Sequence, residues 1–183
     1  ICQMAHDNDM LVLVDEAHGS HLPFGSNLPL SGMKAKADMS AMSLHKTGGS
    51  MTQSSALLIR KSEKVVSSSV KSAINLTQTT SASYVLMASI DVARRQLALR
   101  GNTMIENAIE LADYARDRIN KIPGLHAFGK ELVGLPGVFA FDPTKLSIHV
   151  KKLGLSGYQM ESLLRKKYNI QIELSDLYNI MAI

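Results

Sequence analysis

Apolar residues are grouped in two ways along this chain, and the two groupings predict different elements. Before residue 61 they are concentrated in three short stretches, at Leu11–Val14, 37–44 and 56–60. Short apolar runs bounded by turn residues are typical of strands buried in a sheet. Prolines and glycines recur from 19 to 32, so that stretch is expected to be a loop.

Further along the chain, apolar positions recur at three- and four-residue steps, which predicts helices packed on one face. One helix is expected from Ser81 to Arg100. Gly101-Asn102 is expected to break it and to cap a second helix, which Pro123-Gly124 ends.

The last part of the chain combines both patterns. Residues 138–141 and 146–150 predict paired strands. Ser156 and Gln159 have the spacing of a capping box, so a helix is expected to begin there. A final strand is expected over 171–174.

This order of elements predicts an α/β fold with a mainly parallel sheet and flanking helices. Residues 1–122 are expected to be part of a large domain that includes a long connecting helix. Residues 123–183 are expected to begin a smaller α+β domain. Because the chain opens on Ile1 and closes on an apolar segment, we expect it to be a piece of a longer protein.

Composition excludes some function classes. Hydrophobic residues make up 45% and charged residues 20%, which is ordinary for a globular protein, and no apolar run is long enough to span a membrane. The single cysteine, Cys2, fits a reducing compartment, so a cytoplasmic location is expected. The net charge is +4, but the basic residues are dispersed and aromatic residues are few, so no nucleic-acid partner is expected.

The candidate chemistry lies in two motifs, each placed where a predicted strand ends. The first is Ser43-Leu44-His45-Lys46-Thr47, followed by Gly48-Gly49. A lysine amine in a desolvated, cationic setting becomes a nucleophile that can form a Schiff base. The hydroxyls and the imidazole beside it are phosphate donors, so the motif suits a ligand that carries an aldehyde and a phosphate.

The second motif is Asp15-Glu16-Ala17-His18, which follows the run Leu11–Val14. An unpaired carboxylate at the end of an apolar strand is costly, and a buried cation such as a protonated pyridine nitrogen would offset that cost. Ala17 leaves room for a flat ring, and His18 offers a donor at the edge of that ring.

Together these residues resemble a known family, the pyridoxal-phosphate-dependent ornithine/lysine/arginine decarboxylases, which have the aspartate-aminotransferase (type I) fold. The matching segments are Asp15-x-Ala17-His18, Ser43-x-His45-Lys46-Thr47 and 79–84, the last resembling a dimer-interface segment. The family's usual proline is replaced by Ala82. The resemblance covers almost the whole chain.

The resemblance implies a role for each residue around the ring. Lys46 would hold pyridoxal phosphate through a Schiff base, and Asp15 would pair with the pyridine nitrogen. Ala17 would pack on the ring face, and His18 would hydrogen-bond the phenolic oxygen. Lys46 or a nearby histidine would return the proton after carbon dioxide leaves.

The resemblance also implies phosphate contacts and a partner. Ser43 and His45 would hold the phosphate, while Thr80 and Ser81 would reach the phosphate of a neighbouring subunit, so a homodimer or larger homo-oligomer is expected. The substrate would be a basic amino acid, with arginine favoured over lysine and ornithine. Other parts of the family's site are missing from this chain, which alone is expected to be an incomplete active site.

Two alternatives stay open at this point. Another type I reaction, such as transamination or aldol cleavage, would use the same Asp15 and Lys46. A metal-binding protein would use Asp15, His18 and His21, which fall at three-residue steps. A helicase reading of Asp15–His18 lacks the phosphate-binding loop it requires.

Overall fold

The computed structural model describes residues 1–79 and 81–183. They form two compact units, unit 1 over 1–102 and unit 2 over 103–183, and the division falls inside helix α4, Tyr84–Ile119. The domain boundary expected after residue 122 stays a prediction, because compactness within this chain does not by itself define a domain border.

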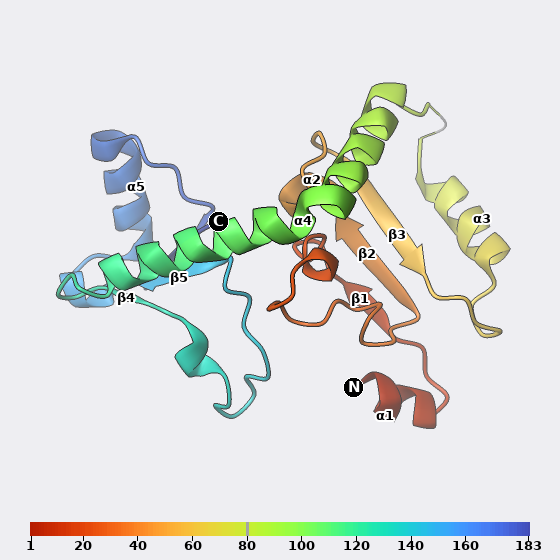
Figure 1. Cartoon of the computed structure of the whole chain (residues 1–183), viewed down its shortest axis with the longest axis horizontal. Coiled ribbons are helices and arrows are strands. Elements are labelled where there is room, and N and C mark those ends of the chain that lie inside the picture. Colours follow the sequence, from red (N-terminus) through yellow and green to blue (C-terminus); the bar gives the residue numbers. More distant parts are fainter. Residues whose placement is uncertain (80) are drawn as a thin grey trace. The chain divides into compact units, whose positions relative to one another are not determined.

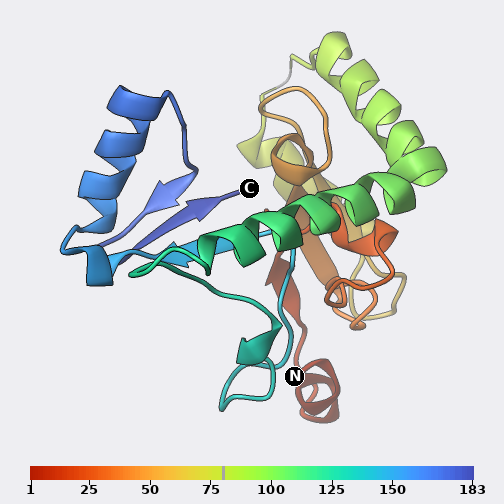
Figure 2. The same cartoon turned by 60° about the vertical axis from the view of Figure 1, so that its left-hand side comes forward.

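Unit 1 is built on a sheet of three strands in the order β1-β2-β3. Strands β1 and β2 are parallel, and β3 runs antiparallel to β2. The strands lie side by side in both views, and the short helix α2 continues directly from the end of β2 (Figures 1 and 2). The elements are α1 Cys2–Asp7, β1 Leu13–Asp15, β2 Met39–Ser43, α2 Leu44–Thr47, β3 Ser55–Ile59 and α3 Ser67–Thr77.

The three strands expected in this part of the chain are present, and the sheet contains the parallel pair that an α/β fold requires. Asp15, the last residue of β1, is the register partner of Ala41 in β2. The turn after β1 therefore lies beside the end of β2, because the carboxyl ends of parallel strands meet at one edge of a sheet. Both candidate motifs are at this edge.

The helix break expected at Gly101-Asn102 is wrong: α4 continues through both residues. Glycine is disfavoured in a helix by about 1 kcal/mol relative to alanine. Packing explains its presence, because a Cβ added at Gly101 would lie 2.9 Å from Cβ of Phe24, closer than real contacts allow. The glycine permits a close approach between helix and loop and does not end the helix.

Unit 2 contains an antiparallel sheet in the order β4-β5-β7-β6. Helix α5 carries the expected capping box, with Ser156 Oγ accepting from Gln159 N–H and Gln159 Oε1 accepting from Ser156 N–H. The elements are β4 His126–Ala127, β5 Leu146–His149, α5 Gly157–Tyr168, β6 Leu174–Ser175 and β7 Asn179–Ala182.

Two strand predictions in unit 2 differ from the structure. Residues 138–141 are not a strand, and β5 pairs with β4 and β7 instead. The last strand lies later than the expected 171–174, split into β6 and β7. Short apolar runs do not reveal their partners, and pairing decides which of them become strands.

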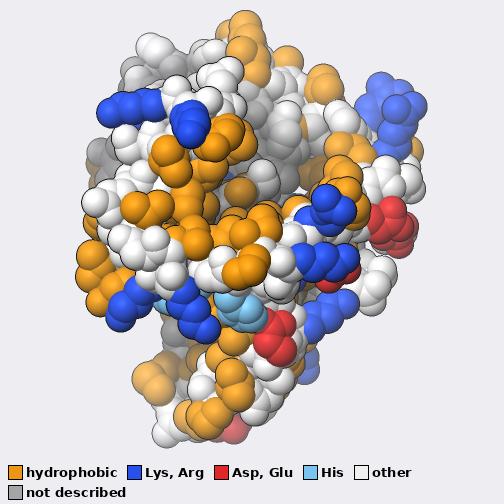
Figure 3. All heavy atoms as spheres, turned by 90° about the vertical axis from the view of Figure 1, so that its left-hand side faces the viewer, with side chains coloured by type: hydrophobic (Ala, Val, Ile, Leu, Met, Phe, Trp, Pro, Cys, Tyr) orange, Lys and Arg blue, Asp and Glu red, His pale blue; other side chains and the backbone are white. Residues whose placement is uncertain are grey.

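One apolar cluster forms the core of unit 2, where α5 packs on β5 and β7. Its buried members are Ala127, Ile148, Val150, Met160, Ile172 and Ile180. Hydrophobic side chains also gather on the surface shown in Figure 3. In unit 2 the exposed ones include Tyr158, Leu163, Tyr168, Ile170 and Leu174.

A membrane-spanning helix would need a long stretch of apolar residues. None of the helices in the described part of the chain combines the length and the hydropathy to cross a bilayer.

Candidate active site

The lysine motif is placed by the transition from β2 into α2. Ser43 ends the strand and is the residue before the helix, so Lys46 follows within one helical turn. The Lys46 side chain is exposed, and its Nζ lies 3.3 Å from Nε2 of His18. An amine and an imidazole from motifs far apart in the sequence therefore meet at one edge of the sheet.

The aspartate motif is placed at the end of β1. One carboxylate oxygen of Asp15, Oδ1, accepts a hydrogen bond of 3.1 Å from the backbone N–H of Ala17. This bond fixes the orientation of the carboxylate at the point where the strand turns. Main-chain bonds join this turn to β2, from Glu16 N–H to Ala41 O at 2.8 Å and from Ser43 N–H to Ala17 O at 3.3 Å.

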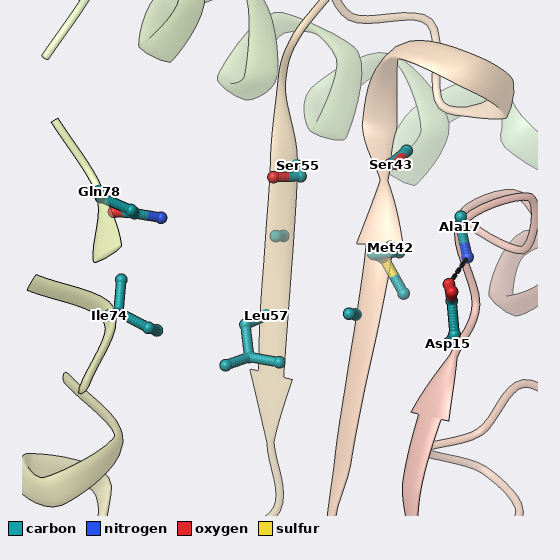
Figure 4. A pocket seen from close by; sticks show the side chains of 10 residues that line it. Asp15, Ala17, Met42, Ser43, Ser55, Leu57, Ile74 and Gln78 are labelled. Carbon is teal, nitrogen blue, oxygen red and sulfur yellow. Dashed lines mark hydrogen bonds between the residues drawn. The ribbon is translucent and has the colours of Figure 1, made fainter. Parts of the chain in front are cut away.

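A cavity of about 440 Å³ lies beside these strand ends. Figure 4 shows Asp15 and Ala17 at the end of β1, Ser43 at the end of β2 and Ser55 at the start of β3, with α3 across from them. The wall combines a carboxylate and two hydroxyls with apolar surface. Its lining residues are Asp15, Ala17, Ala41, Met42, Ser43, Ser55, Ala56, Leu57, Ile74 and Gln78.

His45 is held from the β3 side of the helix. Its Nδ1 lies 2.8 Å from the carbonyl oxygen of Ser54. Because a carbonyl oxygen can only accept, Nδ1 carries a hydrogen, and neutral His45 keeps a lone pair on Nε2. Only the protonated imidazole could donate from Nε2 to a phosphate oxygen.

Glu16 is a residue that sequence reasoning missed. It is only 8% exposed, and its carboxylate accepts from the N–H of Gly32 at 2.9 Å and from Oγ of Ser40 at 2.7 Å. Buried carboxylates need such partners. Leaving a buried polar group without a hydrogen bond costs about 1–3 kcal/mol, and leaving a buried charge without one costs more. Glutamate is mostly a surface residue, so the sequence offered no signal beyond its position between Asp15 and Ala17.

A second missed feature joins the two motifs through hydroxyl groups. Oγ of Ser20 lies 2.7 Å from Oγ1 of Thr47, and Ser20 is 1% exposed. The turn after β1 thus contacts α2 twice, through His18 and through Ser20.

The start of β1 is organised by another buried carboxylate, Asp38. The N–H of Val12 donates to its Oδ2 at 2.8 Å, and Nε2 of His6 lies 2.9 Å from the same oxygen. The Val12 hydrogen bond, followed by the His6 contact, lowers the pKa of Asp38 below its usual value against the opposing effect of burial. The contact between His6 and Asp38 ties α1 to the sheet.

The remaining predicted residues are not brought to this edge by any described contact. Thr80 lies outside the described residues. Ser81 is exposed, and its N–H contacts Oγ1 of Thr79, its near neighbour in the chain. Their role at a neighbouring subunit stays a prediction.

The metal alternative has a specific geometric requirement, a group of three or more histidine, cysteine, aspartate or glutamate side chains around one point. No such group exists among the residues that the structure describes. His21 is buried, whereas Asp15 and His18 are exposed.

Comparison with known proteins shows that the whole chain is similar in sequence to a known protein family. The family model described as Orn/Lys/Arg decarboxylase, major domain, matches residues 1–183. An arginine decarboxylase of Bacillus cereus is 51% identical over 183 residues, and one of Halalkalibacterium halodurans is 53% identical over 184 residues. Each match covers 100% of this chain but only 40% and 37% of the relative. The chain therefore spans well under half the length of these curated relatives.

Solved structures with a similar fold include two lysine decarboxylases. The enzyme of Francisella novicida superposes with a TM-score of 0.75 at 19% identity, covering 93% of this chain and 29% of that one. The constitutive enzyme of E. coli gives 0.68 at 20% identity, covering 96% and 30%. At these identities the likeness shows the fold, and it confirms the α/β class predicted from the sequence.

Proposed function

This chain belongs to the Orn/Lys/Arg decarboxylase family, and from that premise we propose that it carries the cofactor-binding segment of an enzyme that decarboxylates a basic amino acid with pyridoxal phosphate. Arginine is the substrate we favour, because the relatives that match the full chain at 51% and 53% identity are named arginine decarboxylases. The family's alternatives are lysine and ornithine.

The residues at the sheet edge fit this cofactor in their chemistry. Asp15 offers a carboxylate whose orientation is fixed by Ala17 N–H, which suits a protonated ring nitrogen. Ser43 lines the same cavity and offers a hydroxyl for a phosphate, and Ala17 leaves an apolar wall for a flat ring. Lys46 supplies the amine within reach of an imidazole.

The residues of this chain would act as follows. When bound, pyridoxal phosphate supplies an electron sink for the electron pair left by carbon dioxide. Asp15 would keep the ring nitrogen protonated, which strengthens that sink. His18, 3.3 Å from Lys46 Nζ, would accept or return a proton at that amine, and Lys46 would return a proton to the substrate carbon.

The observation that carries this proposal is the meeting of Lys46 Nζ and His18 Nε2 at the strand edge that Asp15 shares. These three groups come from two motifs, and parallel pairing of β1 with β2 brings the motifs together. We also propose a homo-oligomer of the full-length protein in the cytoplasm, as the resemblance of the segment 79–84 to a dimer interface and the single Cys2 suggest.

Release of carbon dioxide from arginine, lysine and ornithine by the full-length protein, with added pyridoxal phosphate, tests the function. We expect release from arginine to exceed release from the other two, and Lys46→Ala to abolish it. Lys71→Ala, which removes an exposed lysine of α3, is the matched control and should leave the rate unchanged. Absence of release from all three amino acids by the unmodified protein would refute the proposal.

A further inference from the structure

Helix α2, which carries Lys46, is too short to hold its position without contacts to its surroundings. It contains only Leu44–Thr47, and no side chain caps its first turn. Isolated helices shorter than roughly 12 residues are unstable in water, so one turn of helix depends on its surroundings. The contacts that hold α2 must therefore also set where Lys46 points.

On the β3 side, α2 is held by one carbonyl group. Ser54 O accepts from the N–H of Leu44 at 3.1 Å and lies 2.8 Å from Nδ1 of His45. These contacts restrain the first half of the helix, before Lys46.

On the side of the turn after β1, a pair of hydroxyl groups contacts the end of α2. Oγ of Ser20 and Oγ1 of Thr47 are 2.7 Å apart, and Ser20 is buried. The end of the helix approaches Ser20 closely, because a Cβ built on Gly48 would lie 3.1 Å from Ser20 Oγ. These contacts restrain the residue directly after Lys46.

Ser20 belongs to the turn after β1, which is held in place by hydrogen bonds. Glu16, at the start of this turn, is fixed by hydrogen bonds from Gly32 N–H and Ser40 Oγ. His18, two residues before Ser20, lies 3.3 Å from Lys46. One turn therefore presents both the imidazole that contacts the amine and the hydroxyl that fixes the neighbouring residue.

We propose that Ser20 and Thr47 are a pair of positioning residues that hold α2 so that Lys46 Nζ stays at His18. Neither hydroxyl touches the reacting atoms in this arrangement; each acts through the helix. The consequence for decarboxylation rests on the proposed function, whereas the effect on the Lys46 amine does not. Because the pair works as a unit, losing either hydroxyl has nearly the same effect as losing both.

The test compares Ser20→Ala, Thr47→Val and the double variant in the full-length protein without cofactor. Acylation of Lys46 by an amine-reactive reagent is measured by peptide mass spectrometry, relative to Lys71 in the same digest. We expect each single variant to raise the rate of Lys46 acylation, relative to that of Lys71, by about 3- to 10-fold, because the free energy of one neutral hydrogen bond corresponds to roughly that factor. The double variant should raise it little further. Thr47→Ser keeps a hydroxyl and is expected to restore most of the original rate.

Ser31→Ala is the matched control, since Ser31 is a buried serine of the same loop whose Oγ accepts from Lys34 N–H within that loop. It should leave Lys46 acylation unchanged. The variants should also slow capture of pyridoxal phosphate by about the same factor. If Ser20→Ala does not fold, Thr47→Val and Thr47→Ser, at a less buried position, give the comparison.

Unchanged acylation of Lys46 in Thr47→Val, or fully additive effects in the double variant, would overturn the pair as positioning residues. If the unmodified protein neither takes up pyridoxal phosphate nor releases carbon dioxide, the proposed function fails. The acylation comparison then still decides the inference about Ser20 and Thr47.

Discussion

The two units of this chain are stabilised by different kinds of interior. Among the described residues, nearly all buried polar side chains are in unit 1: Glu16, Ser20, His21, Ser31, Asp38, Ser40 and Ser54, against Arg116 alone in unit 2. The apolar cluster, in contrast, lies in unit 2. Apolar burial is non-directional, whereas hydrogen bonds fix orientation. In the part of the chain that the structure describes, the interior of unit 1 is therefore richer in groups that fix orientation, and that of unit 2 is richer in apolar packing.

The polar side chain that unit 2 does bury has a packing role. Arg116 donates from Nε to Phe128 O at 2.6 Å and from Nη2 to the carbonyls of Pro143 and Lys145 at 3.2 and 3.1 Å. It thereby joins α4 to the segment before β5. Glu16 is also buried and hydrogen-bonded, but it orients a turn at the candidate active site, whereas Arg116 connects segments within unit 2.

The largest effect that would sharpen this contrast is expected from Asp15→Asn. Asparagine keeps an oxygen for Ala17 N–H but cannot neutralise a protonated ring nitrogen, so the decarboxylation rate should fall by about 10³-fold. The urea midpoint should stay nearly unchanged, because Asp15 is exposed. Steady-state rates and urea unfolding of the full-length protein check both expectations. A full rate in Asp15→Asn would remove the carboxylate from the mechanism.

Ile148→Ala should give the opposite result in unit 2. Removing a buried side chain from the apolar cluster is expected to lower the free energy of unfolding by about 3 kcal/mol. Reaction of Lys46 with pyridoxal phosphate should change little in the folded protein. Leu163→Ala, at an exposed site of α5, is the control and should cost much less. Equal losses in the two variants would contradict the assigned core.

Ser40→Ala tests whether the polar interior of unit 1 serves both stability and positioning. It removes a hydrogen bond to the buried carboxylate of Glu16, at an expected cost of about 2 kcal/mol in unfolding free energy. The reaction of Lys46 with pyridoxal phosphate should slow as well, because the turn that holds His18 loses an anchor. Chemical unfolding and stopped-flow absorbance measure the two effects. A stability loss with an unchanged reaction would mean that Glu16 has only a packing role.

The smallest effect is expected from acid. The folded-state pKa of Asp38 is lowered, so its contribution to stability is present above the unfolded pKa, about 3.9, and is lost as the pH falls through the folded value. The urea midpoint of the wild type should therefore decline at the acid end more than that of Asp38→Asn. If the urea midpoint depended on pH in the same way in both proteins, the Asp38 carboxylate would not be the cause of the loss of stability in acid.

Sequence reasoning succeeded where one local rule decided the outcome. The capping box at Ser156 and Gln159 formed as predicted, because its two hydrogen bonds involve residues three apart. The sites of the first three strands followed from short stretches rich in apolar residues. Parallel pairing of β1 with β2 places the Asp15 and Lys46 motifs at one edge of the sheet, and the roles of their residues at a cofactor stay predictions.

Sequence reasoning failed where contacts between residues far apart in the chain determined the structure. Gly101 continues a helix because Phe24, far away in the sequence, requires space there. Residues 138–141 have the pattern of a strand but no strand to pair with in the described structure. Ser20 and Glu16 became important only through contacts with Thr47 and Ser40, and no local pattern predicts such polar pairs.

The central claim is that the amine of Lys46 is the group that bonds the cofactor aldehyde. Borohydride reduction of the full-length protein with pyridoxal phosphate, followed by peptide mass spectrometry, locates that bond directly. The account predicts one stoichiometric phosphopyridoxyl group on Lys46. Stoichiometric modification of another lysine, with Lys46 unmodified, would contradict it.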